Sequence, residues 1–234
     1  MTSNQDDLDA PAVLAYGDGA CRGNPGPGGY GVVLISGTHR RTLSGGYRRT
    51  TNNRMEIMAA IKTLEALKRR CRVTFRTDSQ YLAKAIGEGW AVKWRAKGWW
   101  ISANKRAKNS DLWQELVTLI EQHSVTVEWL RGHNNDADND AADRLAVEAS
   151  MRPDLQPDAG FEALLANPEP PAISEGHPCF KCRTPVVKQQ TSRKVKPGQQ
   201  YYYEWILRCP QCGAIYTIEG AKRLVGERNP ELPL

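Results

Sequence analysis

The stretch Val73-Thr74-Phe75-Arg76-Thr77-Asp78 and the residues that follow it decide the fold class of this chain. Within it, Val73, Phe75 and Thr77 alternate with polar neighbours, which is the period of a β-strand. The residues from Ser79 to Ile86 then take up the spacing of a helix. A strand that passes directly into a helix predicts a sheet covered by helices.

The segments on either side extend this pattern. Upstream, strands are expected at 13–16, 32–35 and 41–47, and a helical stripe over 57–67 with Asn52 or Asn53 as its cap. The loop over 23–29 is rich in Gly and Pro and is expected to be turn structure. Downstream, the expected elements are a helix over 112–120, a strand over 125–130 and a helix over 140–150. Strands come first and then alternate with helices, so the fold class is α/β, with a mixed sheet flanked by helices.

The chain divides into one main domain and a smaller module. Residues 1–11 read as a flexible tail and residues 12–150 as the main domain. Residues 151–176 contain five prolines and read as a linker with a short helix over 161–166. Residues 177–225 form a cysteine-bearing module, and residues 226–234 a second tail.

The composition indicates a folded protein with an affinity for polyanions. Hydrophobic residues make up 40% and charged residues 25%, close to globular averages. The formal net charge is +6, and two segments concentrate it. Residues 84–108 and residues 181–208 each contain seven Lys or Arg against one acid. Cationic patches of this kind attract nucleic acid because binding releases its counterions.

The sequence also indicates where the protein resides. No apolar run is long enough to span a bilayer, so no membrane partner is expected. The N-terminal residues are polar and acidic, unlike the start of a signal peptide. We therefore expect a cytoplasmic protein whose six cysteines are reduced or metal-bound rather than paired in disulfides.

Four acidic residues stand at the ends of expected elements. Asp18 ends the first strand, Glu56 lies in the first turn of the first helix, and Asp78 ends the fourth strand. Asp143 lies on the last helix of the main domain. Taken singly, each reads as an exposed acid at an element end. If the sheet brings them together, the four carboxylates repel one another, and hard divalent cations such as Mg²⁺ relieve that repulsion.

Four short motifs, in order, resemble those of bacterial type I ribonucleases H (ribonuclease HI). The first is Asp-Gly-Ala-Cys-Arg-Gly-Asn-Pro-Gly-Pro-Gly-Gly at 18–29 and the second is Thr-Thr-Asn-Asn-Arg-Met-Glu at 50–56. The third is Thr-Asp-Ser-Gln-Tyr at 77–81, and the fourth joins Arg-Gly-His at 131–133 to Asn-Asp-Ala-Ala-Asp at 139–143. Any one motif arises by chance, but the ordered set identifies the chain as a member of this family. The resemblance implies a five-stranded mixed sheet flanked by helices.

The resemblance also implies the chemistry. The family hydrolyses the RNA strand of RNA–DNA hybrids by a two-metal-ion mechanism that leaves 5′-phosphate and 3′-hydroxyl ends. By motif position, Asp18, Glu56, Asp78 and Asp143 would hold two Mg²⁺ ions, with Mn²⁺ as an alternative metal. His133 would assist proton transfer or product departure. A lone loop histidine is usually just solvated, but the motif favours the catalytic reading of His133.

Positions that match the family's RNA contacts are polar. They are Asn24, Asn52 and Gln80, together with the backbone near Cys21 and Gly23. Polar groups suit the 2′-hydroxyl, which separates RNA from DNA. Thr51 resembles part of a pocket for a DNA phosphate. Asn52 also reads as a simple helix cap, and both roles are compatible.

A Trp- and Lys-rich segment resembles the family's basic handle, which meets the DNA strand. Its matching residues are Trp90, Lys97, Lys105, Arg106 and Lys108. Tryptophans at such spacing usually pack, and charged runs usually stay in solvent. We expect Trp94 and Trp113 to pack and the cations to remain solvated.

The chain departs from the family pattern at three places. Gly17 stands where the family commonly has Thr. The loop before Asp143 is unusually acidic, and one residue is inserted near 87–89. None of these departures removes an expected metal ligand.

The C-terminal module carries two Cys-x-x-Cys pairs. Cys179, Cys182, Cys209 and Cys212 offer four thiolates at the spacing of a zinc ribbon, and four thiolates suit tetrahedral, structural Zn²⁺. A redox pair or free thiols are the alternatives. The module is not part of the basic family pattern.

The role of the C-terminal module is open among three readings. It is an accessory nucleic-acid grip, a docking site for a protein, or a ribbon whose aromatic residues merely pack. The grip would use phosphate contacts from Lys188, Arg193, Lys194 and Lys196, and base stacking on residues 201–203 and Trp205.

Two rival functions belong to different classes. One is a non-catalytic hybrid-binding protein with a relict site, against which the four intact acids argue. The other is a DNA-cutting relative on the same fold, since fold does not determine substrate. The residues that match RNA contacts and the handle argue against it. A monomer is the default oligomeric state.

Overall fold

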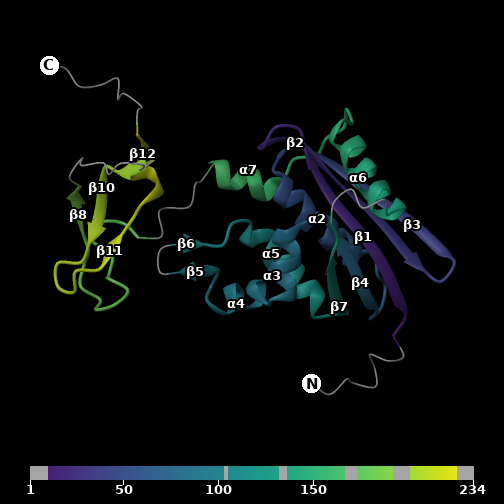
Figure 1. Ribbon diagram of the computed structural model, residues 1–234, viewed down its shortest axis with the longest axis horizontal. Coiled ribbons are helices and arrows are strands. Elements are labelled where there is room, and N and C mark those ends of the chain that lie inside the picture. Colours follow the sequence, from purple (N-terminus) through teal and green to yellow (C-terminus); the bar gives the residue numbers. More distant parts are fainter. Residues whose placement is uncertain (1–9, 103–104, 132–135, 167–172, 192–200, 226–234) are drawn as a thin grey trace. The chain divides into compact units, whose positions relative to one another are not determined.

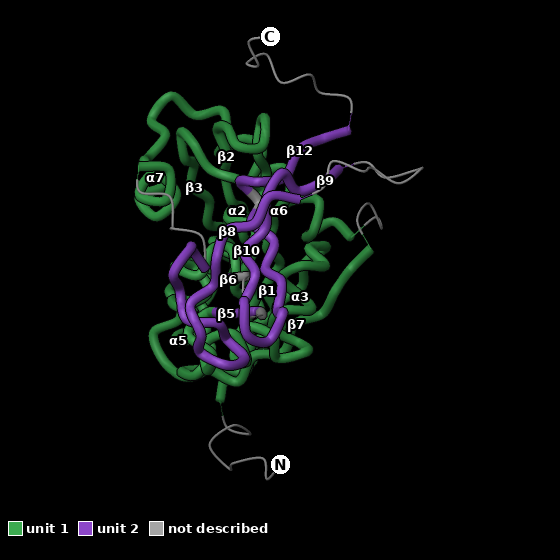
Figure 2. The backbone as a smooth tube through the Cα atoms, turned by 90° about the vertical axis from the view of Figure 1, so that its left-hand side faces the viewer, with its two compact units in different colours: residues 1–99, 107–168 green, residues 100–106, 169–234 purple. Residues whose placement is uncertain are grey.

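The computed structural model describes residues 10–102, 105–131, 136–166, 173–191 and 201–225 (Figure 1). Within these residues the chain forms two compact units, coloured separately in Figure 2. The first comprises residues 1–99 and 107–168, and the second comprises residues 100–106 and 169–234. No helix in the described ranges is long and apolar enough to cross a membrane.

The first unit is built on a five-stranded sheet with the strand order β3-β2-β1-β4-β7. The strands are β1 (Ala12–Cys21), β2 (Gly26–Ser36), β3 (His39–Thr50), β4 (Arg72–Thr77) and β7 (Ser124–Trp129). β1, β2 and β3 pair antiparallel, whereas β4 pairs parallel with both β1 and β7. The expected mixed sheet of an α/β fold is therefore confirmed.

Helices cover both faces of this sheet (Figure 1). One face carries α2 (Asn52–Glu65), α3 (Gln80–Gly87), α4 (Trp90–Ala96) and α5 (Ser110–Ile120), and the other carries α6 (Ala137–Ser150). Side chains of β1 alternate between the two faces. Val13 and Ala15 join the core under α2, whereas Tyr16 packs towards α6 with Ala142. Burial on both faces fixes the register, because a slip of one residue would exchange the faces.

The glycine-rich stretch after β1 differs from the expected turn. Only residues 22–25 bend, and β2 begins at Gly26. The physical reason is close approach of the backbone. A Cβ atom at Gly29 would lie 2.6 Å from the Ala146 carbonyl oxygen of α6, and one at Gly28 would lie 2.9 Å from the Ala20 carbonyl oxygen. These glycines are therefore strand residues that let a helix and a neighbouring strand pack tightly.

Two of the element boundaries that differ from expectation bear on the acids. β1 continues to Cys21, so Asp18 lies inside the strand rather than at its end. α2 begins at Asn52, with Thr51 as the N-cap residue, so Glu56 is the fifth helical residue and lies beyond the first turn. Asn52 does not cap this helix, because it is already the first helical residue, and its side-chain amide donates to Glu56.

Residues 151–166, within the stretch expected to be a linker, are part of the first unit and pack on its sheet and α2. Gln156 pairs with the edge strand β3 through backbone hydrogen bonds to Gly46 and Arg48, both 2.9 Å long. α7 (Ala159–Ala166) follows, and its Glu162 forms a bidentate ion pair with Arg48. Polar backbone groups at the edge of the sheet are thereby paired.

The second unit contains short strands. β8 (Val187–Gln190), β10 (Trp205–Arg208) and β11 (Ile215–Tyr216) form a three-stranded sheet in the order β11-β10-β8. β9 (Tyr201–Tyr203) pairs with β12 (Lys222–Leu224), and β5 (Trp100–Ser102) with β6 (Lys105–Arg106). Among its described residues, the buried core of the C-terminal part is small: Ile173, Cys179, Val186, Leu207, Cys209, Tyr216, Ile218 and Ala221.

Candidate functional site

The parallel pairing of β1 and β4 brings Asp18 and Asp78 to one edge of the sheet. Tyr16 pairs with Arg76, and Asp18 and Asp78 each follow two residues later. Asp18 is buried, with 8% of its surface exposed, and its carboxylate accepts a 2.7 Å hydrogen bond from the Gly19 N–H. Asp78 directly follows the last residue of β4. Two acids that are far apart in sequence therefore share one strand end.

Helix α2 brings Glu56 to the same edge. A Cβ atom at Gly19 would lie 2.4 Å from the Glu56 backbone nitrogen, so only glycine allows β1 to approach the helix this closely. The Glu56 carboxylate accepts a hydrogen bond from the Ser79 hydroxyl on one oxygen and one of 2.8 Å from the Asn52 amide on the other. These two donors fix the orientation of the side chain.

Helix α6 carries Asp143 over the opposite side of β1. Asp18 pairs with Gly31 of β2, and a Cβ atom at Gly31 would lie 2.0 Å from the Ala142 carbonyl oxygen. The helix therefore passes directly over the residue paired with Asp18, and Asp143 is the next residue after Ala142. Asp143 is exposed at this point.

The other three acids act electrostatically on Asp18. Burial raises the pKa of Asp18 to about 7, and the negative charges of Asp78, Asp143 and Glu56 contribute to that rise. Burial also raises the pKa of Glu56, against the lowering effect of the Ser79 and Asn52 hydrogen bonds. Without a nearby positive charge, the ionised forms of these carboxyl groups are therefore disfavoured.

The donor set fits a hard divalent cation. It consists of carboxylate oxygens, which Mg²⁺ and Mn²⁺ accept together with water and substrate phosphate. The carboxylates lie too far apart to surround a single ion by themselves. In the described part of the chain, the one group of three or more Cys, His, Asp or Glu whose ligand atoms lie close enough together to hold one ion is the cysteine group. An open carboxylate site suits Mg²⁺, because this ion usually keeps several waters.

Three of the residues expected to contact RNA gather around the start of α2. The Asn24 side-chain oxygen accepts a 3.2 Å hydrogen bond from the Asn52 backbone N–H, one of the free donors of the helix start. The Cys21 thiol donates to the Gly23 carbonyl at 2.8 Å. Asn52 connects this group to Glu56. The polar residues of the first two motifs thus form one connected surface beside the acids.

Gln80 and Thr51 lie beside the same acids. Gln80 opens α3 two residues after Asp78 and is exposed. Thr51 is half-buried at the N-cap of α2, and no hydrogen bond from its side chain caps the helix.

The handle packs as expected in the first unit. Trp113 is fully buried, contacts Trp94 edge-on with ring centroids 6.0 Å apart, and donates a 2.9 Å hydrogen bond to the Tyr81 hydroxyl. The ring centroids of Trp90 and Trp94 are 6.2 Å apart. Lys97 and Lys108 remain exposed. The aromatic residues therefore support the helices while these two cations face solvent.

Part of the handle belongs to the hairpin of β5 and β6. The Arg106 guanidinium lies 5.5 Å from the Trp100 ring centroid. The Lys105 side chain lies outside the described part of the chain, and so does His133.

The departures from the family pattern have structural explanations. A Cβ atom at Gly17 would lie 2.3 Å from the Phe75 ring, so Phe75 occupies the room that a side chain would need. Asp136 caps α6 by accepting from the backbone N–H groups of Asp138 and Asn139. Asp138 pairs with Arg40. The acidic loop therefore starts and anchors a helix. Gly89, in the inserted region, has the left-handed φ of +68° that precedes α4.

Sequence reasoning missed two contributors to this edge. Ser79 both caps α3, by accepting from the Leu82 N–H at 3.2 Å, and donates to Glu56. Trp129, at the end of β7, donates from its indole N–H to the Asp78 carbonyl at 2.9 Å. The position of Ser79 directly after Asp78 was the available signal, whereas nothing in the sequence pointed to Trp129.

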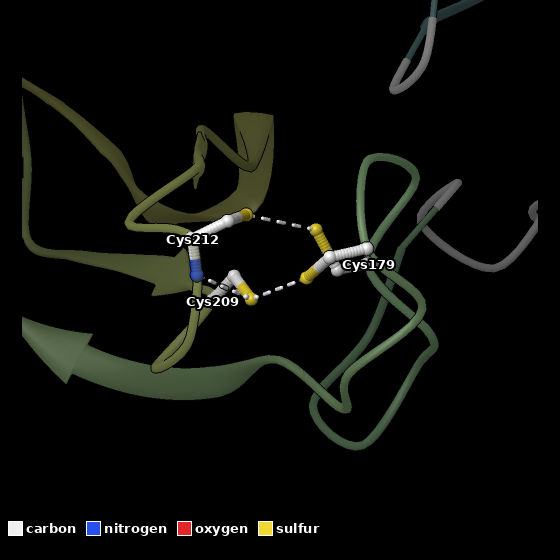
Figure 3. A group of neighbouring side chains, drawn as sticks. Cys179, Cys209 and Cys212 are labelled. Carbon is white, nitrogen blue, oxygen red and sulfur yellow. Dashed lines mark hydrogen bonds between the residues drawn. The ribbon is translucent and has the colours of Figure 1, made fainter.

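The four cysteines of the module form a separate site (Figure 3). The Sγ atoms of Cys179 and Cys212 are 3.6 Å apart, those of Cys182 and Cys209 are 3.3 Å apart, and all four lie within 4.8 Å of one another. Tetrahedral zinc with bonds of about 2.3 Å would separate its sulfurs by about 3.8 Å, so the cluster fits this ion. A hydrogen bond with the Tyr216 hydroxyl lowers the pKa of Cys179 to about 6, which favours the thiolate that metals bind.

Comparisons with known proteins agree with the fold and the motifs. The family model for RNase H matches residues 10–151. The chain is 58% identical over 149 residues to the ribonuclease H of Syntrophus aciditrophicus, which covers 64% of this chain and 86% of that relative. It is 49% identical over 151 residues to the ribonuclease HI of Synechocystis sp., covering 64% and 94%.

A solved structure gives the same result. LC9-RNase H1, described as a type 1 RNase H with the type 2 active-site motif, is similar with a TM-score of 0.56 and 35% identity. That similarity covers 62% of this chain and 74% of LC9-RNase H1. The sheet order, the ordered motifs and these matches coincide on the same residues, and the chain belongs to the ribonuclease H family, whose enzymes cleave the RNA strand of RNA–DNA hybrids.

Proposed function

We propose that this protein is an endonuclease that hydrolyses the RNA strand of RNA–DNA hybrids with water as the nucleophile. Its products would carry 5′-phosphate and 3′-hydroxyl ends. The observation that supports the proposal is the convergence of Asp18, Glu56, Asp78 and Asp143 at one edge of an RNase H sheet, where burial and mutual repulsion raise the Asp18 pKa. Such a site favours bound cations over bare carboxylates.

The four acids would hold two Mg²⁺ ions, with Mn²⁺ as an alternative. When bound, such ions neutralise charge on the scissile phosphate and make water a better nucleophile. Hydrogen bonds within the chain hold two of these carboxylates in position. Ser79 and Asn52 hold both oxygens of Glu56, and the Gly19 N–H holds one oxygen of Asp18. Ligands that are fixed before binding cost less reorganisation in the reaction.

Substrate choice would come from the polar surface beside the acids. The connected group of Asn24, Asn52 and the backbone near Cys21, with Gln80 at the start of α3, offers donors and acceptors to the 2′-hydroxyls of RNA. Thr51 would contribute to a pocket for a DNA phosphate. The cations of the handle would contact the DNA strand, supported by packed tryptophans. The proton-transfer role of His133 stays a prediction.

The cysteine cluster would bind structural Zn²⁺. The buried side chains of the module are few, so the free energy of metal binding would stabilise its fold. A cytoplasmic location and a monomeric state stay predictions.

One cleavage assay tests the proposal. Labelled RNA–DNA hybrid, duplex DNA and duplex RNA are each incubated with the full-length protein, with or without Mg²⁺. We expect cleavage only of the RNA strand in the hybrid, only with Mg²⁺, and its loss in Asp18→Asn and Asp78→Asn. Asp154→Asn, which makes the same change at an exposed acid outside the site, should retain full activity. Cleavage of duplex DNA, or full activity in Asp18→Asn, would refute the assignment.

A further inference from the structure

The C-terminal module carries one of the two concentrations of positive charge in this protein. Residues 177–225 contain nine Lys or Arg and two Glu, which gives a formal charge of +7. The whole chain carries +6, so the remaining 185 residues carry −1. Four thiolates around one zinc ion would together carry −2, which still leaves the module at +5. The module therefore attracts a polyanion at long range, in addition to the cationic segment 84–108.

Two lysines of the module are held over aromatic rings. The Lys188 ammonium on β8 lies 4.4 Å from the ring centroid of Trp205 on β10. The Lys222 ammonium on β12 lies 4.3 Å from that of Tyr201 on β9. The negative face of an aromatic ring attracts a cation, so each contact restrains its lysine side chain. Because their side chains are already restrained, these lysines lose less entropy when they bind an anion.

The same contacts distinguish a phosphate grip from a base-stacking platform. Stacking a base requires a bare ring face. An ammonium group lies over one face of Trp205 and another over one face of Tyr201, so these two faces are not open to a base, and Tyr203 meets Tyr201 edge-on at 86°. These rings therefore serve to position cations. Positioned cations are what the phosphate backbone of a nucleic acid requires.

Two acids in this part of the chain have hydrogen-bond partners of their own. Glu204 is bonded to Arg223 at 2.9 Å, and the Glu175 carboxylate accepts a 2.9 Å hydrogen bond from the Lys188 backbone N–H. Lys188 and Arg208 are exposed. Glu204 is thus paired with an arginine, and Glu175 is bonded to a backbone N–H rather than to the Lys188 ammonium.

We propose that the module binds the phosphate backbone of the RNA–DNA hybrid through Lys188 and Lys222, without regard to base sequence. The identity of the polyanion rests on the proposed function. The module would raise affinity for the hybrid at a given salt concentration and leave the chemical step to the acids of the first unit.

The test measures binding apart from cleavage. The paired variant Lys188→Gln/Lys222→Gln removes both charges in the full-length, zinc-loaded protein. Binding of a labelled hybrid is followed by fluorescence anisotropy across a salt series, with Mg²⁺ omitted. We expect the slope of log affinity against log salt to fall by about 2, roughly one for each lysine charge removed. Hybrids of different sequence should lose affinity by the same factor.

Two controls keep the result interpretable. Lys188→Arg/Lys222→Arg retains both charges and should retain the slope, and zinc content reports whether each variant is folded. Lys68→Gln/Arg69→Gln removes the same charge from the exposed turn after α2, at the opposite end of β4 from Asp78, and should leave the slope unchanged. A wild-type slope in the module variant, or an equal loss in the turn variant, contradicts the proposal. Because no cleavage is measured, either result stands apart from the success of the nuclease assignment.

Discussion

Asp158, which lies beyond the last helix of the sheet, holds the buried guanidinium of Arg54 through hydrogen bonds of 2.7 and 2.8 Å. Asp111 of α5 binds the same guanidinium at 2.9 and 2.6 Å. Arg54 is completely buried and lies two residues before Glu56 in α2. A residue of the segment after α6 is therefore part of the support under the candidate active site.

We expect Asp158→Ala to lower the free energy of unfolding at pH 7 by about 3–5 kcal/mol, because it leaves part of a buried charge unpaired. Burial would raise the pKa of Asp158, but hydrogen bonds from Arg54 and Thr50 outweigh it and hold the pKa below the ordinary value. The stabilisation is thus present above an unfolded pKa of about 3.9 and is lost as the pH falls below it. Urea denaturation at pH 7 and pH 3 measures both effects. Asp154→Asn should change stability by less than about 0.5 kcal/mol, and equal effects of Asp158→Ala at both pH values would contradict the account.

The raised pKa of Asp18 predicts that Asp18→Asn stabilises the Mg²⁺-free protein. The folded state holds the proton up to a pKa of about 7, whereas the unfolded chain releases it near 3.8. The wild type therefore loses stability as the pH rises from about 4 to 7, and the variant does not. Since one pKa unit corresponds to about 1.4 kcal/mol, the gain above pH 7 should be on the order of 2–4 kcal/mol. Thermal denaturation at pH 4 and pH 8 measures it, and a variant less stable than the wild type at pH 8 would show that Asp18 is not destabilised by its charge.

Removal of the Ser79 hydroxyl should raise the pKa of Glu56. Ser79→Ala removes a hydrogen bond that lowers the Glu56 pKa, so the acidic limb of the pH–kcat profile should move to higher pH. We expect kcat to fall by roughly 10-fold or more, as for other residues that orient a metal ligand, with little change in KM. Ser79→Thr keeps the hydroxyl and should restore both. An unshifted pH profile in Ser79→Ala would contradict this role. Ser79 would then act only as the N-cap of α3.

Zinc removal should unfold the C-terminal module and spare the first unit. Cys209→Ser should lower the zinc content from one ion per chain and remove hydrogen-exchange protection at Val186, Leu207 and Tyr216, which surround the cluster. Protection in β1 and β4 should not change. Cys21→Ser, a substitution outside the cluster, should retain zinc. Full protection of Leu207 in metal-free protein would mean that the module folds without an ion.

The sequence by itself determined the local elements and the identity of the acids. The alternation at 73–77 and the helical spacing of 79–86 predicted β4 and α3, and the ordered motifs picked out Asp18, Glu56, Asp78 and Asp143. The two Cys-x-x-Cys pairs predicted a four-sulfur cluster, which the structure forms. These features are encoded locally because side-chain period and ligand spacing depend on neighbours in the chain.

Only the tertiary structure decided the rest. Gly26–Gly29 read as a turn, yet packing of α6 against β2 makes them strand residues, because the close approach is a contact with residues about 120 positions away. The hydrogen bond from Ser79 to Glu56 and the ion pair of Arg54 with Asp158 also join residues that are distant in the sequence. Burial, and with it the raised pKa of Asp18, arises from contacts between distant segments, which no pattern of adjacent residues can specify.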